Sequence, residues 1–363
     1  MLMNSKEHVA WLKKSALMDK SKACAPVMKR VYNECLAAKN EKVLIITDNG
    51  TNGYNAAPVL AGSYCLAARE IGLKTNLVVQ SEKKSLENAS QSVVDGLKEI
   101  TEGNNIVILC VSNKLGEIKE ITKSFRKFMH STGQKFISTT SLGTIRDEHF
   151  HILMEAINID YKLLQKRQSG VKKILDRASK IHVTTGRGTD IEINVEGKKA
   201  ISNDGNYRTP GIGGNIPCGE VYIPPKGKDG VDGKVVIDAS SRNSLGTKTL
   251  KSPITMRIKK GRVTGIEGGK DAELLAKSLS DAEKEAKKPS NVPLIGEFGI
   301  GMNPKARITG SMIVDEKVMG TAHVAVGSNS WFGGDIKTIV HFDQVFKNPK
   351  IKADNKFIEI DHN

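Results

Sequence analysis

The feature that most constrains the fold is an alternation of short apolar runs with helical stretches in the first half of the chain. The runs lie at residues 43–50, 74–80, 104–113 and 135–141, and stretches with helical periodicity separate them. A strand, a helix and a further strand in series make a right-handed crossover, which leaves the two strands parallel. Residues 1–165 are therefore expected to form an α/β domain with an open, mainly parallel sheet.

The pattern changes after about residue 170, where apolar and polar residues alternate and Gly, Asn and Asp break the alternation. ITMRIKKGRVTGI predicts a hairpin with Lys260 and Gly261 at its turn, and one helix, DAELLAKSLSDAEKEAKK, follows it. A chain of 363 residues is also long for a single core. Residues 166–363 are therefore expected to form a second, β-rich (α+β) domain with a curled antiparallel sheet.

Composition bounds the partners. The net charge of +15 is spread over Lys-rich helical segments, and aromatic residues make up only 5% of the chain, which favours a solvated surface over a nucleic-acid face. Five cysteines without a CxxC pair predict reduced thiols, and Cys218 is a disfavoured candidate metal ligand. No stretch approaches the length of a membrane span, and the first twenty residues, MLMNSKEHVAWLKKSALMDK, are charged throughout and contain no signal-peptide core. We expect a cytoplasmic protein with neither a nucleic-acid nor a membrane partner.

Acids and histidines occur in the second half within stretches that otherwise predict buried strands. These residues are Glu220, Glu297, Glu316, His323, His341 and Asp343. In a strand, His341 and Asp343 point to the same face. Buried acids are costly unless paired and repel one another, and a divalent cation removes both costs. Mixed carboxylate and imidazole ligands suit Zn, Co, Mn or Fe(II), and this many ligands predict two ions bridged by Glu297.

Each of these residues could also have a structural role without a metal. His341 and Asp343 could be a pair on a strand face, Glu220 a surface acid, and Glu316 an ion-pair partner of Lys317. The other histidines considered lack apolar settings of this kind and are expected to be structural or exposed: His130, His149, His151, His182 and His362.

The ordered motifs NIPCGEV, the GE of PLIGEFGIG, DEKVMGTAHVAVG and the terminal HFD resemble the thermophilic aminopeptidases, dinuclear metallopeptidases of the aminopeptidase T and S type. The resemblance implies a two-domain subunit, a homodimer and a peptide substrate attacked by a metal-bound hydroxide. It further implies proton transfer by Glu220 or Glu316. Its implied ligands for two divalent ions are Glu220, Glu297, His323, His341 and Asp343, with Glu316 displaced to seven residues before His323 instead of five.

Two departures point elsewhere. Ser330 stands where that family has a tyrosine, and Trp331 beside it has no phenolic hydroxyl. GSNSWFGGDIKTIVHFD and ITMRIKKGRVTGIEGGKDAELL resemble 2,5-dihydroxypyridine dioxygenase, a mononuclear non-haem iron enzyme that has histidine in place of Glu297 and no acid in place of Glu220. The main prediction is a metal-dependent aminopeptidase. The alternatives are an iron dioxygenase, with Fe(II) on Glu297, His341 and Asp343, and a metal-binding relative without activity.

Overall fold

The computed structural model describes residues 2–3, 5–84, 87–122 and 124–360. The chain divides into two compact units: Met1–Tyr161 with Gly205–Cys218, and Lys162–Asp204 with Gly219–Asn363. The sequence predicted one boundary between residues 165 and 166. In the structure, residues 205–218 belong to the first unit although they follow that boundary.

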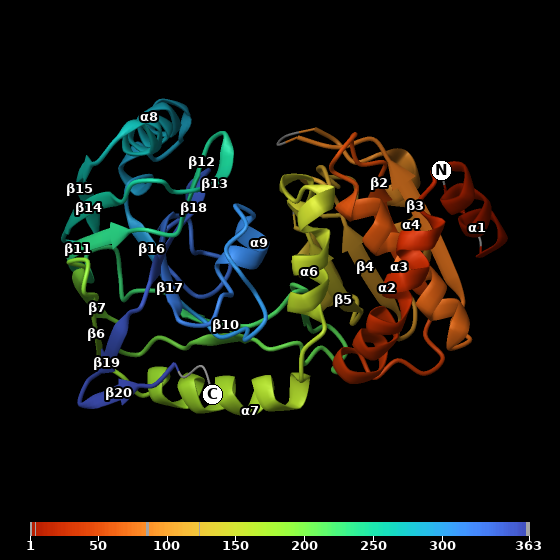
Figure 1. Ribbon diagram of the computed structural model, residues 1–363, viewed down its shortest axis with the longest axis horizontal. Coiled ribbons are helices and arrows are strands. Elements are labelled where there is room, and N and C mark those ends of the chain that lie inside the picture. The colour runs from red at the N-terminus through yellow and green to blue at the C-terminus, as the bar shows by residue number, and fades with distance from the viewer. Residues whose placement is uncertain (1, 4, 85–86, 123, 361–363) are drawn as a thin grey trace. The chain divides into compact units, whose positions relative to one another are not determined.

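The first unit is built on a six-stranded sheet in the order β1-β3-β2-β4-β5-β9, drawn on the right of Figure 1. Its strands are β1 (Leu2–Met3), β2 (Val43–Asp48), β3 (Thr75–Gln80), β4 (Ile106–Cys110), β5 (Lys135–Thr139) and β9 (Gly213–Gly214). All neighbours are parallel except β1, which runs antiparallel to β3 at the edge. The prediction of a mainly parallel α/β sheet is confirmed.

Helices connect these strands because a parallel pair needs a crossover. They are α1 (Ser5–Lys14), α2 (Met18–Arg30), the π-helix η1 (Val31–Cys35), α3 (Ala56–Glu70), α4 (Gln91–Glu99), α5 (Phe125–Ser131), η2 (Leu142–Thr144), η3 (Asp147–His149) and α6 (Phe150–Ile157). One core cluster packs Val93 and Leu97 of α4 and Met129 of α5 on Leu44 and Val107 of the sheet. The apolar runs therefore became strands that are buried by their own crossover helices.

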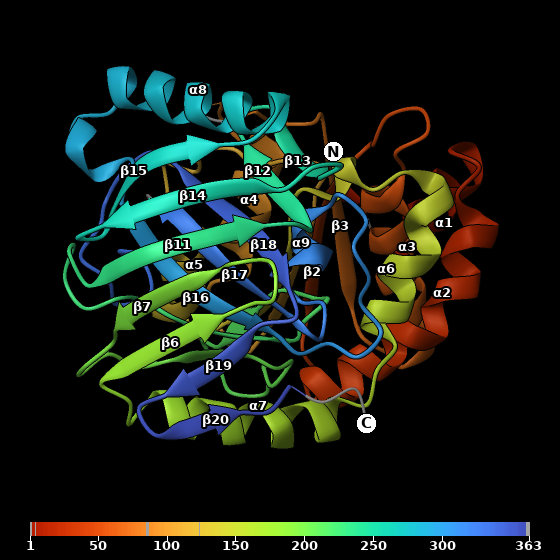
Figure 2. The same cartoon turned by 60° about the vertical axis from the view of Figure 1, so that its left-hand side comes forward.

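The second unit holds two seven-stranded antiparallel sheets. The inner sheet has the order β13-β12-β18-β17-β16-β10-β8: β8 (Ile201–Asn203), β10 (Glu220–Ile223), β12 (Ser240–Asn243), β13 (Gly246–Thr249), β16 (Ile295–Gly301), β17 (Thr321–Gly327) and β18 (His341–Lys347). The outer sheet has the order β15-β14-β11-β7-β6-β19-β20: β6 (Lys180–Thr184), β7 (Asp190–Asn194), β11 (Val231–Ile237), β14 (Ile254–Lys259), β15 (Arg262–Glu267), β19 (Lys350–Ala353) and β20 (Lys356–Ile358). Figure 2 shows the outer sheet in front of β16, β17 and β18.

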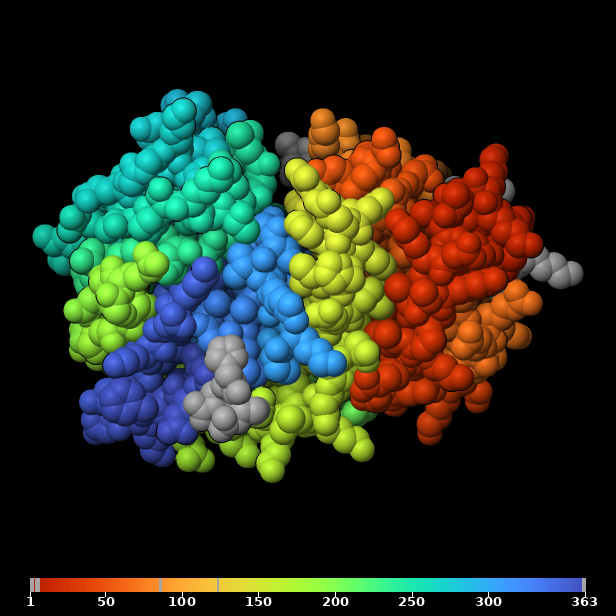
Figure 3. Space-filling model, in the orientation of Figure 1, coloured from red at the N-terminus to blue at the C-terminus, as the bar shows by residue number. Residues whose placement is uncertain are grey.

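Four helical segments complete this unit: α7 (Tyr161–Leu175), whose first residue lies in the first unit, α8 (Lys270–Glu285), η4 (Pro289–Asn291) and α9 (Met312–Asp315). α8 lies at the surface of the unit, as Figure 3 shows. Its exposed residues include Lys270, Glu273, Lys277, Lys284 and Glu285. β14 and β15 form the predicted hairpin. Lys260 and Gly261 both have positive φ, 47° and 72°, as a tight two-residue turn requires.

The inner sheet has two different faces because side chains alternate along each strand. One face is apolar, with Val221, Ile300, Val324 and Phe346 among its buried residues. The opposite face carries the acids and histidines singled out in the sequence. The antiparallel prediction is thus confirmed for this half of the chain, and its alternation places the polar residues together.

Candidate metal centre

Strand register brings the predicted ligands to one face of the inner sheet. Ala325 of β17 lies opposite Asp343 of β18 on one side and Glu297 of β16 on the other. His323, two residues before Ala325 on the same face, lies opposite Gly299. Directly opposed residues point to the same side of a sheet, so these side chains converge over β17.

Two further members join them from the neighbouring positions. His341 lies two residues before Asp343 and opposite Gly327, and Glu220 of β10 lies opposite Gly301 of β16. Five of the six predicted ligands therefore stand on one face of four adjacent strands. The sixth, Glu316, follows α9 outside the sheet.

The ligand atoms lie close together. Within the described part of the chain, Glu297, His323 and Asp343 offer atoms that all lie within 4.8 Å of one another, and all three residues are buried. His323 Nε2 lies 3.2 Å from Glu297 Oε1. His341 Nε2 lies 3.1 Å from Asp343 Oδ1 and 3.6 Å from Glu297 Oε2. We call these four residues the four-residue centre.

His341 is oriented as a metal ligand would be. Its Nδ1 lies 2.8 Å from the carbonyl oxygen of Ser328, to which it donates. Ligating histidines usually donate their other ring N–H to an acceptor of this kind, which fixes the tautomer. Nε2 of His341 is then the ring nitrogen that could bind an ion lying next to the carboxylates of Glu297 and Asp343.

His323 is the most enclosed member. Its side chain has no solvent exposure, and its Nδ1 has no hydrogen-bond partner among the described residues. A buried polar atom without a partner is costly, which indicates that the site also holds a group other than the described residues, such as a water molecule or an ion. Space for the ring comes from a glycine: a Cβ on Gly299 would lie 2.2 Å from both Cε1 and Nε2 of His323.

Electrostatics favours a cation between the acids. Burial raises the pKa of Glu297, although both imidazoles oppose the rise. Burial acts in the same direction on Asp343, but His341 holds the pKa of that carboxyl well below its usual range. Burial would lower the pKa of each imidazole, yet Glu297 raises that of His323 and Asp343 that of His341, each to about 9.

Positive charge in the site is therefore carried by ring protons when no metal is bound. A divalent ion can take the place of those protons, since metal ligation requires neutral imidazole and ionised carboxylate. The donor set, its burial and the fixed tautomer of His341 therefore fit a divalent metal.

The remaining two predicted ligands lie beside a lysine. Lys317 Nζ lies 3.1 Å from Oε1 of Glu220 and forms a shorter ion pair with Glu316. Glu220 Oε1 also accepts from Asn203 Nδ2 at 3.1 Å, and its Oε2 lies 3.9 Å from His323 Nε2. With 5% exposure, Glu220 is no surface acid. Ligation by Glu220 and Glu316, and their proton transfer, stay predictions.

Sequence reasoning missed three contributors to the site. Lys317 was considered only as a neighbour of Glu316, and Ser328 and Gly299 were not singled out. Glycines spaced two apart along β16, at 299 and 301, could have indicated a face that leaves room for large side chains opposite.

An aromatic group borders the centre. The ring of Trp331 lies 4.9 Å from that of His341, and it contacts Phe332, whose ring contacts Tyr222. Trp331 is 54% exposed while Phe332 is buried, so the group runs from the centre to the surface. This group gives the centre an apolar border on the side of His341.

The other histidines and Cys218 do not join the centre. His130 and His151 are exposed, His149 is partly exposed, and His182 pairs with Asp190 at 2.8 Å. His362 lies outside the described residues. Cys218 is buried and forms no disulfide, and it does not belong to the group of described residues that could hold an ion.

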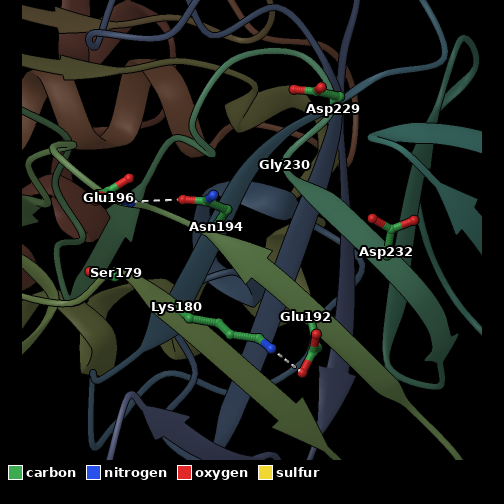
Figure 4. Close-up of a pocket in the computed structure, with 8 residues that line it drawn as sticks. All are labelled: Ser179, Lys180, Glu192, Asn194, Glu196, Asp229, Gly230 and Asp232. Carbon is green, nitrogen blue, oxygen red and sulfur yellow. Dashed lines mark hydrogen bonds and ion pairs between the residues drawn. The ribbon is translucent and has the colours of Figure 1, made fainter.

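A surface hollow on the outer sheet has different chemistry. It has a volume of about 440 Å³ and is lined by Ser179, Lys180, Glu192, Asn194, Glu196, Asp229, Gly230 and Asp232 (Figure 4). Lys180 pairs with Glu192 at 2.6 Å, as the figure shows. The hollow has no imidazole lining it, and it is separate from the four-residue centre.

Comparison with known proteins decides the family. The model of the 2,5-dihydroxypyridine 5,6-dioxygenase (NicX) family matches residues 23–361. The chain belongs to this family. A curated relative, 2,5-dihydroxypyridine 5,6-dioxygenase of Pseudomonas putida KT2440, is 28% identical over 203 residues, which cover 53% of this chain and 56% of the relative. The chain thus spans little more than half the length of that relative in this match.

Solved structures share the fold. The structure of 2,5-dihydroxypyridine dioxygenase from Pseudomonas putida KT2440 superposes with a TM-score of 0.74 at 17% identity, covering 94% of this chain and 97% of that chain. AmpT from Thermus thermophilus superposes with a TM-score of 0.60 at 13% identity, covering 94% and 95%. The aminopeptidase resemblance is therefore one of fold.

The predicted metalloaminopeptidase activity is wrong. The family model and the curated relative both name a dioxygenase, an oxidoreductase and not a hydrolase or protease, and they lend no support to zinc or cobalt. The motifs misled because they are short and consist of acids and histidines, which can hold the metal of a hydrolase or that of an oxygenase. No helix in the described residues is long and apolar enough to cross a membrane. Cytoplasmic location, the homodimer and the absence of a nucleic-acid or membrane partner stay predictions. The peptide substrate, which no comparison tests, was implied only by the aminopeptidase resemblance.

Proposed function

We propose that this protein is an iron-dependent dioxygenase that opens the ring of a dihydroxylated aromatic compound of the 2,5-dihydroxypyridine type. The observation that carries the proposal is the four-residue centre, a buried set of two imidazoles and two carboxylates in a chain of this family. Two histidines and a carboxylate are the usual protein ligands of Fe(II) in non-haem oxygenases. His323, His341, Asp343 and Glu297 would hold the ion.

Ferrous iron would supply the one-electron chemistry that lets molecular oxygen react with a closed-shell aromatic ring. The residues of the chain provide binding and orientation. His341, held by the Ser328 carbonyl, presents Nε2 in a fixed direction. Glu297 and Asp343 supply negative charge that attracts a divalent cation.

The aromatic group supports a flat substrate. Trp331 stands edge-on to His341 with its ring planes at 65°, and more than half of its surface is exposed. An aromatic ring gains about 0.5–1.5 kcal/mol beyond area burial from an offset or edge contact with another ring. Trp331 therefore offers a planar compound a contact surface next to the metal ligands.

Oxygen uptake tests the proposal. Metal-free protein is loaded with Fe(II) without oxygen, and uptake is followed with 2,5-dihydroxypyridine as the probe. His341→Ala should lose iron and at least about 100-fold of the activity, since even an outer partner of a ligand is worth 10–100-fold. His182→Ala is the matched control because it removes another histidine paired with an aspartate, at 2.8 Å. Iron-loaded protein that consumes no oxygen, or an active His341→Ala variant, would contradict the proposal.

A further inference from the structure

A fully buried lysine lies next to the four-residue centre. The side chain of Lys317 has no solvent exposure, although lysine is almost never fully buried unless it is paired. Its ammonium lies 3.1 Å from Glu220 and makes a shorter ion pair with Glu316. Both carboxylates are themselves largely enclosed, with 6% and 14% of their side chains exposed.

The backbone fixes this lysine in place. Its N–H donates to the carbonyl of Val314 at 3.1 Å, and its carbonyl accepts from the N–H of Asn303 at 2.8 Å. Asp315, two residues earlier, accepts from the N–H of Thr309 at 2.7 Å and from that of Gly310 at 3.0 Å. These bonds fix the backbone of Lys317 in an ordered turn, which directs its side chain toward the two acids.

Glu220 connects the lysine to the centre. Its Oε1 faces Lys317, and its Oε2 lies 3.9 Å from His323 Nε2, which lies 3.2 Å from Glu297. The polar face of the inner sheet therefore has two places for positive charge. The first is the four-residue centre, and the second lies between Glu220 and Glu316.

We propose that the Lys317 ammonium permanently fills the second cation position, so that Glu220 and Glu316 bind this lysine and the centre takes a single divalent ion. The inference rests on the proposed metal centre and goes beyond it, because it assigns roles to three residues that hold no metal. It departs from the sequence prediction of two bridged ions.

Charge balance agrees with one ion. Four carboxylates, those of Glu220, Glu297, Glu316 and Asp343, share this enclosed region with one ammonium. One divalent ion bound to neutral imidazoles leaves a single negative charge over the group. A second divalent ion would leave a single positive charge instead, and it would have to lie against the ammonium that already occupies the space between Glu220 and Glu316, where the two cations repel each other.

Mn(II) is a suitable probe because isolated and neighbouring Mn(II) ions give different electron paramagnetic resonance spectra. We expect the wild type to bind one Mn(II) per chain with the spectrum of an isolated ion. Lys317→Ala opens space between two carboxylates and should bind two, with a coupled spectrum. Lys135→Ala is the matched control, since Lys135 is 2% exposed and paired with Glu41 in the other unit, and it should still bind one.

A second comparison decides the matter if Lys317→Ala does not fold. Glu220→Gln should keep the single ion with an affinity loss of about 10–100-fold, as for a residue that contacts a ligand but holds no metal. Glu297→Gln should lose more than about 100-fold.

Two ions in the wild type, one ion in folded Lys317→Ala, or equal losses in Glu220→Gln and Glu297→Gln would each overturn the inference. No ion in the wild type would instead overturn the proposed function.

Discussion

Replacing Gly299 with alanine adds one methyl group, which should weaken metal binding strongly while it lowers the stability of the fold only slightly. A Cβ at this position would lie 2.2 Å from two ring atoms of His323, whereas ordinary contacts begin at 3.4 Å. The imidazole must therefore move by at least about 1.2 Å, and it is enclosed on all sides. Gly299 has no positive φ, so the backbone itself accepts alanine.

The magnitude follows from this displacement. A shift of about 1 Å in a site group costs about 100-fold, or about 2.7 kcal/mol, in function that depends on geometry. Overpacking a filled core costs about 1–3 kcal/mol of folding free energy, and removing a strand glycine returns about 0.4–1 kcal/mol of it. Gly299→Ala should thus bind metal about 100-fold more weakly while its Tm falls by only a few degrees.

Metal titration by calorimetry and thermal unfolding of the metal-free protein measure the two effects separately. Gly265→Ala is the control, because Gly265 is also a strand glycine and a Cβ there would meet nothing nearer than 3.8 Å. If Gly299→Ala binds metal as tightly as Gly265→Ala, His323 is not a ligand and the reasoning fails.

Three further predictions concern stability and the substrate. Burial would raise the pKa of Glu41, but its ion pair with Lys135 holds it below the usual 4.5, so the pair stabilises the fold above that pH. Urea titrations should show Glu41→Gln costing about 3 kcal/mol at pH 7 and progressively less as pH falls below 4.5; a pH-independent cost would contradict this. Asp315→Ala should cost about 2–4 kcal/mol in the same assay, because buried amides lose their acceptor. The Asn329 side chain accepts from the N–H of Ile336 and donates to the carbonyl of Gly296 on β16, which ties residues 329–336 around Trp331 to the inner sheet. Asn329→Ala should therefore raise KM more than it lowers kcat in steady-state assays; unchanged KM would refute a substrate role for that segment.

The fold was accessible from the sequence where the pattern was local. The apolar runs that became β2 and β4 are buried on both faces. Continuous Val, Ile and Leu residues predict such a strand. The division of the β-rich half into two sheets could not be predicted from the sequence, because strand order depends on pairings between distant segments such as β12 with β18. β9 consists of two glycines and has no side-chain pattern to read.

The site was accessible where polar residues interrupt apolar strands. Glu297, His323, His341 and Asp343 stand out for that reason, and alternation along β18 correctly placed its two members on one face. The role of Lys317 was not accessible. Its position depends on the backbone bond to Asn303 and on Glu220, which is almost a hundred residues earlier, and neither leaves a local signal.

The choice between the two chemistries failed for a related reason. Both resemblances rest on short motifs, with HFD in common, and their acids and histidines fit either one metal or two. Only the match of nearly the whole chain to one family distinguished between them.

Isotope labelling tests the central claim most directly. Iron-loaded protein is given 2,5-dihydroxypyridine under ¹⁸O-labelled molecular oxygen, and the product is analysed by mass spectrometry. The account predicts a ring-opened product that carries both atoms of one oxygen molecule. A product without label, or an unchanged substrate in the presence of bound iron, would contradict it.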